Sequence, residues 1–332
     1  MKENIIFIII LLFLLSMLYL FSNNEDKVFN EDKVYLRLAE VHPNDHPTTI
    51  AMNQFSDLVK EKTNGRIEIV IYDNEQLGGE KSALEQVGFG SIDFARTSIA
   101  VVSGIEEAFN VLQLPYIYES SEHMFDVLNG EIGTYYFDIL EPKGYIGIGW
   151  YDGGARNFYN SKKRMEFIQD FNGMTFRVLE NDMMSDITEA LGAQAVKMPY
   201  ENIHSSLERG IIEGAENNWP SYDTSYHYEV AKFYTLTEHV RIPEILIASD
   251  KILERISEED LQIIKNCAQE AQFFQRTLWK EKEEESIDKL KEEGVYIIKI
   301  KDQSQFKEAT KVVYEKYAND YMHIVEAIQQ IK

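Results

Sequence analysis

Val34-Tyr-Leu-Arg-Leu-Ala39 and Arg66-Ile-Glu-Ile-Val-Ile-Tyr72 are short segments rich in apolar residues, and an amphipathic stretch over residues 49–62 separates them. This pattern predicts a strand, a helix that ends at Asn64-Gly65, and a second strand. A strand, a helix and a strand at this spacing form a parallel unit with a right-handed crossover. The start of the folded region therefore predicts an α/β fold.

A short pattern occurs twice along the chain. Gly90-Ser-Ile-Asp-Phe-Ala-Arg96 follows a helix expected over residues 79–87, and Gly210-Ile-Ile-Glu-Gly-Ala-Glu216 has the same order of glycine, two residues, an acid and a short strand. A glycine in this place is typical of a helix end. The repetition predicts the same structural step in two similar lobes, with coincidence as the alternative for so short a match. About 300 residues beyond the N-terminal segment suffice for two medium-sized lobes.

The C-terminal third predicts a long helix. Ser257-Glu-Glu-Asp260 is a good helix start, with a capping serine and acids in the first turn, and Gly294 ends the helical pattern. A strand is expected over residues 295–300, and a last helix over residues 303–329. The long helix of residues 257–293 is expected to brace both lobes.

The N-terminal segment has the pattern of an export signal or a membrane anchor. Residues 5–21 are almost wholly apolar and are followed by the polar run Ser22-Asn-Asn-Glu-Asp26. The run is slightly short for a relaxed span of about 20 residues, and it lacks a small-residue cleavage site. We therefore predict a signal peptide or N-terminal anchor over residues 1–30, with the remainder soluble on the outer face of the membrane. A lipoprotein is not expected, because the only cysteine is Cys267.

Composition argues against several classes of function. The chain has 33 basic and 56 acidic side chains, a formal net charge of -23, which makes nucleic acid or an anionic lipid surface an unfavourable partner. A single cysteine leaves no intramolecular disulfide. The sequence has no phosphate-binding loop, nucleophile elbow, complete dinucleotide fingerprint or metal-ligand spacing. We expect no metal and no cofactor.

Two arginines in apolar or glycine-rich surroundings point to an anionic ligand. They are Arg156, in Trp150-Tyr-Asp-Gly-Gly-Ala-Arg-Asn-Phe-Tyr159, and Arg177, in Phe171-Asn-Gly-Met-Thr-Phe-Arg-Val178. A guanidinium binds a carboxylate through two parallel charge-assisted hydrogen bonds, most strongly where water is excluded. This favours capture of a small organic acid. The alternative is that each arginine closes an internal salt bridge.

Further polar residues stand in loops after predicted strands, where ligands bind in open α/β sheets. They are His42 and His46 after the first strand, Glu80 at a helix start, and Arg96 and Ser98 after the strand that begins near Ile92. An acid such as Glu80 suits sugar hydroxyls better than a dicarboxylate. Tyr222 lies in an aromatic segment that either covers a sugar ring or packs the lobe.

The chain resembles the solute-binding receptors of TRAP transporters, the DctP-type family, over nearly all of its length beyond the N-terminal segment. The motifs that carry the resemblance, in the family's order, are Phe55-Ser-Asp-Leu-Val-Lys-Glu-Lys-Thr-Asn-Gly-Arg-Ile-Glu-Ile69, Gln76-Leu-Gly-Gly-Glu80, Gly90-Ser-Ile-Asp-Phe94, Leu114-Pro-Tyr116, Arg156, Gly173-Met-Thr-Phe-Arg-Val178, Glu213-Gly-Ala-Glu-Asn217 and Ser257-Glu-Glu-Asp-Leu-Gln262. The resemblance implies a two-lobed periplasmic-binding-protein-like fold of mixed sheets flanked by helices. The lobes are expected at residues 31–153 plus 243–282 and at residues 154–242 plus 283–332.

The resemblance also implies a function and roles for residues. The implied protein is an extracytoplasmic receptor, not an enzyme, that closes on an organic acid and delivers it to a membrane-embedded TRAP permease. Arg177 corresponds to the family's main carboxylate ligand, Arg156 to its second arginine and Asn217 to the motif asparagine. The motif here begins with Glu213 where the family has aspartate. The segments around Arg156 and Asn217 are similar to receptors for hexuronic acids, so glucuronate or galacturonate is favoured.

Several alternatives remain at the level of the sequence. The alternative ligands are a C4-dicarboxylate and another sugar acid. The alternative function is that of a sensory receptor that presents its ligand to a membrane kinase. A uronate-acting enzyme would need Glu80 and a second acid as a catalytic pair in a cleft. A monomer is expected, because no interface motif is evident.

Overall fold

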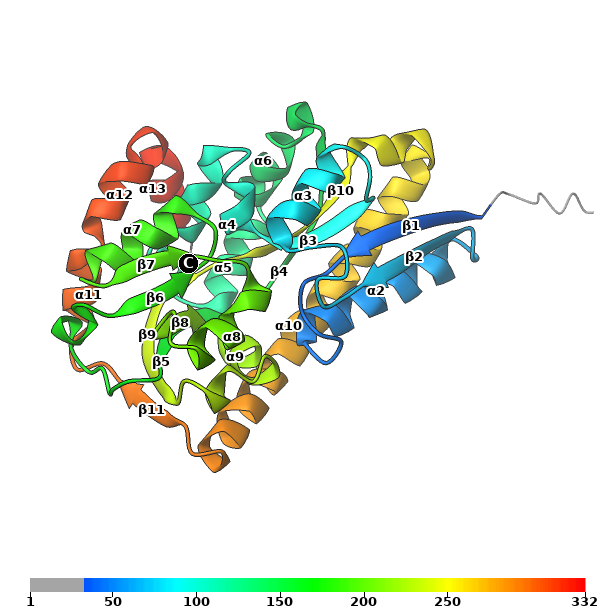
Figure 1. Cartoon of the computed structure of the whole chain (residues 1–332). Coiled ribbons are helices and arrows are strands. Elements are labelled where there is room, and N and C mark those ends of the chain that lie inside the picture. Colours follow the sequence, from blue (N-terminus) through cyan, green and yellow to red (C-terminus); the bar gives the residue numbers. More distant parts are fainter. Residues whose placement is uncertain (1–32, 332) are drawn as a thin grey trace, which may run out of the picture. The chain divides into compact units, whose positions relative to one another are not determined.

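Two mixed β-sheets organise residues 33–331, the part of the chain that this computed structural model describes (Figure 1). The first sheet has the spatial order β2 (Ile67–Tyr72), β1 (Val34–Ala39), β3 (Phe94–Ser98), β10 (Glu244–Ser249) and β4 (Tyr145–Tyr151). The second has the order β11 (Tyr296–Lys299), β9 (Phe233–Arg241), β5 (Ala155–Asn160), β8 (Gly214–Asn217), β6 (Thr175–Val178) and β7 (Gln194–Lys197). Each sheet forms one lobe, which confirms the expected two-lobed α/β fold.

Helices cover both sheets. The main ones are α2 (Pro47–Lys62), α3 (Glu80–Gly88), α4 (Ile99–Val102), α5 (Ser121–Leu128), α6 (Glu131–Asp138), α7 (Asp182–Ala190), α8 (Ile203–Glu208), α9 (Trp219–Thr224), α10 (Glu258–Glu292), α11 (Gln303–Ala309), α12 (Lys311–Tyr317) and α13 (Met322–Gln330). Within residues 33–331 no helix combines the length and apolarity that a bilayer span requires. The predicted signal or anchor over residues 1–30 lies outside the described residues.

The predicted parallel unit is confirmed in the first lobe. Strand β1 pairs with β2 in parallel register, Val34 opposite Ile67, and α2 makes the crossover between them. The helix begins two residues before the predicted Thr49, because the His46 side chain accepts a hydrogen bond from the backbone N–H of Thr48 and caps the first turn.

The repeated sequence pattern is confirmed as a repeated structural step. Strands β1, β2 and β3 with α2 and α3 have the spatial order β2-β1-β3, and β6, β7 and β8 with α7 and α8 have the order β7-β6-β8. Gly90 and Gly210 follow α3 and α8 with φ of 74° and 68°, a conformation that glycine adopts without steric cost. The two halves of the site are therefore built on equivalent strand ends.

Alternating side chains of β10 fill the two faces of the first sheet. Ile245 and Ile247 join the core beneath α3, α5 and α6, whereas Leu246 and Ala248 join the core beneath α2 and α10. All four side chains are fully buried. Strand β10 is therefore buried on both faces, which agrees with its nearly continuous apolar sequence.

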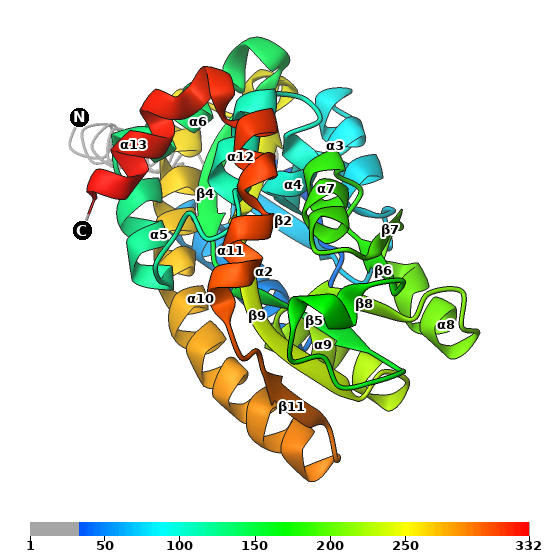
Figure 2. The same ribbon diagram turned by 90° about the vertical axis from the view of Figure 1, so that its left-hand side faces the viewer.

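The chain crosses between the sheets at two neighbouring places, residues 152–154 between β4 and β5 and residues 242–243 between β9 and β10. A side chain at Gly153 would lie 2.5 Å from the Ile242 carbonyl oxygen, so the two crossings approach each other too closely for a Cβ atom. Helix α10 packs against α2, β4 and α9 and so contacts both lobes (Figures 1 and 2), which confirms its bracing role.

The prediction of one last helix over residues 303–329 is wrong, because the segment consists of α11, α12 and α13 (Figure 2). Its apolar side chains belong to different cores: Phe306 packs in the second lobe, whereas Val313 and Ile328 join the core shared with α5. One straight helix cannot reach both, and Thr310 marks the break, where its hydroxyl donates to the Phe306 carbonyl. Because α12 also contacts α7, the predicted assignment of residues 283–332 to the second lobe stays a prediction.

Replacing Ser257 with alanine tests the cap of the bracing helix. The Ser257 hydroxyl accepts from the Asp260 N–H at 3.1 Å, and we expect Ser257→Ala to lower the free energy of unfolding by about 1 kcal/mol. Thr277→Ala, on an exposed turn of the same helix, is the control and should cost nothing, because threonine is a weaker helix former than alanine. Urea unfolding of both variants measures the difference. Equal losses would show that the cap does not stabilise the helix.

Candidate functional site

Two adjoining hollows lie where parallel strands of both sheets end at their carboxyl termini, the usual place for ligands in open α/β sheets. They share Glu80, Leu179 and Tyr200 in their walls. The first is lined by Glu75, Glu80, Val101, Arg177, Leu179, Glu180, Pro199 and Tyr200. The second is lined by Val41, His42, Glu80, Ser98, Arg156, Leu179, Tyr200, Asn217, Asn218, Ser221 and Glu244. Both lobes contribute to each hollow.

Arg177 is a buried guanidinium without a carboxylate partner. It lies on β6 and is 2% exposed; its Nε donates to the Met198 carbonyl at 2.8 Å, and its Nη1 is buried with no hydrogen-bond partner. No acid among residues 33–331 forms an ion pair with it. Burial lowers its pKa, and nearby Arg156 lowers it further, while Glu216 acts in the opposite direction. Burying a charge without a partner is costly, so this group is prepared for an anion.

Arg156 differs, because it already has an internal partner. Its Nε donates to Glu216 Oε2, and its Nη2 donates to Glu216 Oε1 at 2.9 Å and to the Glu216 carbonyl at 2.9 Å. Burial would lower its pKa, but Glu216 outweighs burial and raises it. The alternative of an internal salt bridge holds for Arg156, because β5 and β8 are adjacent antiparallel strands that bring Glu216 beside it, and its role as a second ligand residue stays a prediction. The Nη1 atom of Arg156 has no acceptor in the described part of the chain, and Arg156 lines the second hollow.

Arg96 lies behind the hollows and does not line them. It is fully buried among Glu40, Glu80 and Glu244, with its Nε 2.7 Å from Glu40 Oε2 and its Nη1 3.1 Å from Glu80 Oε1. Burial would raise the pKa of Glu40, but Arg96 and His42 outweigh it and lower that pKa to about 2. Arg96 therefore fixes the acids around it and has no free edge for a ligand.

Glu80 stands at the first residue of α3 between the two hollows. Its Oε1 accepts from Arg96 Nη1 and from the Ser98 N–H, each at 3.1 Å, whereas its Oε2 accepts from no group in residues 33–331. A carboxylate oxygen held in this way is a strong acceptor for a hydroxyl. The Ser98 side chain itself caps α4 through the Ala100 N–H.

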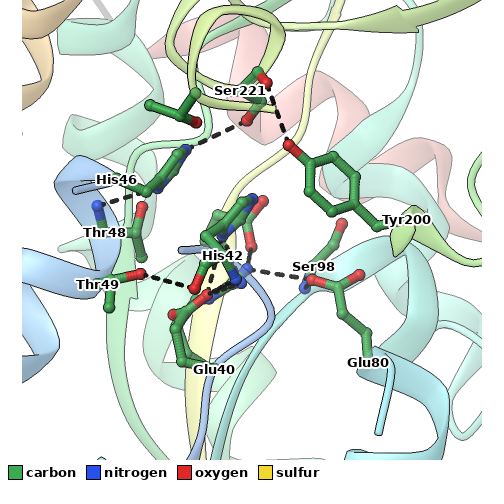
Figure 3. A network of polar contacts seen from close by, with 12 residues as sticks. Glu40, His42, His46, Thr48, Thr49, Glu80, Ser98, Tyr200 and Ser221 are labelled. Carbon is green, nitrogen blue, oxygen red and sulfur yellow. Dashed lines mark hydrogen bonds and ion pairs between the residues drawn. The ribbon is translucent and has the colours of Figure 1, made fainter. Parts of the chain in front are cut away.

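The two predicted histidines stack on each other with ring centroids 3.8 Å apart (Figure 3). His46 Nδ1 accepts from the Thr48 N–H at 3.2 Å, so its proton is on Nε2, which donates to Ser221 Oγ at 3.2 Å across the lobes. Burial lowers the pKa of both rings and keeps them neutral. His42 lines the second hollow, and His46 lies behind it as a contact between α2 and α9.

Asn217 reaches the site and Tyr222 does not. Asn217 Oδ1 accepts from the Asn218 N–H at 2.9 Å, while no acceptor in the described residues takes its Nδ2, so the amide is free to donate into the second hollow. Tyr222 packs against Tyr159 and Tyr234, and its hydroxyl donates to the Ala231 carbonyl at 2.6 Å. Tyr222 therefore packs inside the second lobe, as the alternative in the sequence analysis expected. It lines neither hollow, so this geometry gives no support to a contact with a sugar ring.

Sequence reasoning missed Tyr200 and Glu75, which line the site. Tyr200 borders both hollows, and its hydroxyl donates to the Ser221 carbonyl at 3.1 Å (Figure 3). The signal for Tyr200 was its position three residues after Lys197, the end of β7, a strand that the sequence did not reveal. Within residues 33–331 no group of three or more His, Cys, Asp or Glu side chains has the arrangement of a metal site. The charged and hydrogen-bonding side chains that line the two hollows are the groups available to a ligand.

Comparison with known proteins gives a consistent result. The family model described as DctP, bacterial extracellular solute-binding protein, family 7, matches residues 38–320. A solute-binding protein of Chromohalobacter salexigens is 37% identical over 292 residues, 88% of this chain and 87% of the relative.

Solved structures agree with the sequence match. A TRAP periplasmic solute-binding protein from Chromohalobacter salexigens with bound D-glucuronate has a TM-score of 0.87 at 37% identity, covering 90% of this chain and 100% of the other. One from Xanthobacter autotrophicus with bound β-D-galacturonate has a TM-score of 0.87 at 34% identity, with coverage of 90% and 100%. The chain belongs to the DctP family of solute-binding receptors of TRAP transporters, as its motifs predicted.

Proposed function

We propose that this protein is the extracytoplasmic receptor of a TRAP-type transporter and that it captures a hexuronate, D-glucuronate or D-galacturonate. The observation that carries the proposal is the buried guanidinium of Arg177. It forms no ion pair with an acid of residues 33–331 and lies beside hollows lined by hydrogen-bonding side chains. The bound hexuronates in two similar receptors support the choice of acid. A membrane-embedded TRAP permease is the proposed partner, the receptor acts as a monomer, and the ligand leaves chemically unchanged.

The roles of the site residues follow from their free atoms. Arg177 Nη1 faces the ligand carboxylate, and a guanidinium fork fits a carboxylate better than the point charge of a lysine. Arg156, held by Glu216, presents its free Nη1, and Asn217 presents its amide nitrogen. Glu80 Oε2 accepts from a sugar hydroxyl, while Arg96 and His46 support the site from behind.

The charges at the site favour a sugar acid over a C4-dicarboxylate. Four acids line the hollows, and we call them the acidic wall: Glu75, Glu80, Glu180 and Glu244. A second carboxylate on the ligand would meet the like charge of this wall in a poorly hydrated space. Hydroxyl groups of a pyranose ring would instead donate to it. The acidic wall therefore supports a monocarboxylate that carries several hydroxyls.

Closure of the lobes is the proposed mechanism of capture. Ligand-facing residues come from both lobes, Glu80 from the first and Arg177 from the second, so a ligand bonds to both only when the lobes are closed. Direct contacts also join the lobes: Asn181 Nδ2 donates to the Ala100 carbonyl at 2.8 Å and to Ser103 Oγ at 2.7 Å. The crossings at residues 152–154 and 242–243 are the proposed hinge.

A comparison of uronates with the matching neutral sugars tests the ligand class. We expect D-glucuronate or D-galacturonate at about 100 times its Kd to stabilise the folded protein by about 2.7 kcal/mol, which raises its Tm by several degrees. D-Glucose and D-galactose differ from these acids only at the carboxylate carbon and should give no shift. Succinate tests the dicarboxylate alternative. A shift with succinate and none with either uronate would overturn the proposed substrate.

Truncation of Arg177 tests the carboxylate contact. Arg177→Ala should weaken uronate binding by about 2–5 kcal/mol, a factor of roughly 30 to several thousand, because a buried charge partner is lost. Arg209→Ala removes an arginine from an exposed position after α8 and should leave the affinity unchanged. Isothermal titration calorimetry measures both, with circular dichroism as a check of folding. Normal binding by a folded Arg177→Ala variant would show that the carboxylate lies elsewhere.

A further inference from the structure

Glu75 is a carboxyl group at the site that none of the predicted roles uses. It lies in the turn after β2, where Asn74 and Glu75 have φ of 49° and 58°. Backbone hydrogen bonds hold this turn against the loop after β1, from Asn74 N–H to the His42 carbonyl at 2.9 Å and from Glu75 N–H to the Glu40 carbonyl at 3.3 Å. A non-glycine residue in this conformation is uncommon and is often found at ligand sites. The turn fixes the direction of the Glu75 side chain.

The Glu75 carboxyl lines the first hollow together with Arg177. Both of its oxygens are buried, and neither forms a hydrogen bond of normal length and angle with any group in residues 33–331. Arg177 lines the same hollow, yet the two side chains form no ion pair. An ionised carboxylate in this position would pay the full cost of lost hydration.

Acids from both lobes lie around the Glu75 carboxyl. Burial raises the pKa of Glu75 to about 8, and two acids raise it further: Glu201, in the short 3-10 helix η4 (Tyr200–Asn202) of the opposite lobe, and Glu80. The backbone N–H of Glu201 acts in the opposite direction without reversing the shift.

The charged and titratable groups around Glu75 come from every neighbouring element. They are Glu201 and Tyr200 from η4, Glu80 from α3, Arg177 from β6 and Glu180 from the loop after β6. Three of these five are acids, and the one cation among them forms no ion pair with Glu75. The surroundings therefore favour a neutral Glu75 while the lobes are closed.

We propose that Glu75 carries a proton in the closed form, so that it faces the bound acid as a neutral group and each capture event takes up a proton from solvent. This inference rests on the proposed function, because it concerns the same acid at the same site. Glu75 acts as a specificity-determining residue: a neutral carboxyl beside Arg177 tolerates the carboxylate of the ligand, and an ionised one repels it.

The pH dependence has a definite direction. The hollow that buries Glu75 is lined from both lobes, so opening should return the carboxyl to water, where a glutamate ionises at about pH 4. Burial raises its pKa to about 8 in the described structure, so the closed form should bind more protons than the open form between these two values. Affinity for the acid should therefore rise as pH falls from about 8 toward 5, by up to about tenfold per pH unit.

Calorimetry in two buffers measures the proton directly. Titration of wild-type protein with D-glucuronate and D-galacturonate at pH 7, in phosphate and in Tris, gives the number of protons taken up per acid bound, since the two buffers differ in ionisation enthalpy. We expect an uptake of more than about half a proton for the acid that binds, as the closed-form pKa implies. Glu75→Gln, which keeps a hydrogen-bond donor and cannot titrate, should bind the acid with an uptake near zero. Glu85→Gln removes the same charge from an exposed position on α3 and should keep the wild-type uptake.

The outcomes separate this inference from the proposed function. Binding without proton uptake by the wild type would overturn the proton on Glu75 and leave the uronate receptor standing. Uptake that persists in Glu75→Gln would overturn it as well and would assign the proton to another group, such as Glu244, whose pKa burial raises to about 7. Absence of binding by either uronate would overturn both.

Discussion

The cost of burying a guanidinium without a counter-charge is the constraint on which this site depends. The protein buries three arginines near the hollows, and it neutralises two of them itself, Arg96 with three glutamates and Arg156 with Glu216. Among the described residues, Arg177 donates only to the carbonyl oxygen of Met198. In the proposed function an anionic ligand supplies the missing charge and hydrogen bonds, and part of the free energy that folding did not recover at this position becomes binding energy.

The same constraint explains why so many acids surround a site for an acid. Glu40 and Glu216 are needed to bury Arg96 and Arg156, and they hold those side chains in one orientation. The acidic wall then selects among anions, because one carboxylate can reach Arg177 while a second would meet like charge. Selection of this kind comes from repulsion of the wrong ligand as much as from attraction of the right one. The proposed proton on Glu75 relieves the repulsion beside Arg177, where the ligand carboxylate is proposed to bind.

Local signals were sufficient for much of the fold. The alternation of residues 34–39 and 66–72, the glycines at 90 and 210 and the cap at Ser257 each specify a nearby backbone conformation, and the structure has the expected strand, turn or helix there. Contacts between distant segments were not predictable in this way. The Glu216 partner of Arg156 depends on how β5 and β8 are aligned, and the burial of Glu75 in the same hollow as Arg177 depends on how the two lobes face each other. Apolar and glycine-rich surroundings singled out Arg156 and Arg177, and the family motif added Asn217, but only the fold distinguishes the unpaired arginine from the paired one.

Helix α10 connects the bracing of the lobes to the hinge between them. Gln275 in this helix accepts from the Asp152 N–H at 3.0 Å and donates to the Asp152 carbonyl at 2.8 Å, so one amide side chain satisfies both backbone groups of a hinge residue. At Gly154, with φ of 65°, a Cβ atom would lie 2.9 Å from the Trp279 ring of the same helix. The hinge peptide therefore lies directly on α10 and cannot swing away without losing these contacts. In the proposed closure, rotation of the lobes is therefore confined to torsions beside the helix. Glu80 at the start of α3 and Arg177 on β6 then return to the same geometry each time the lobes close.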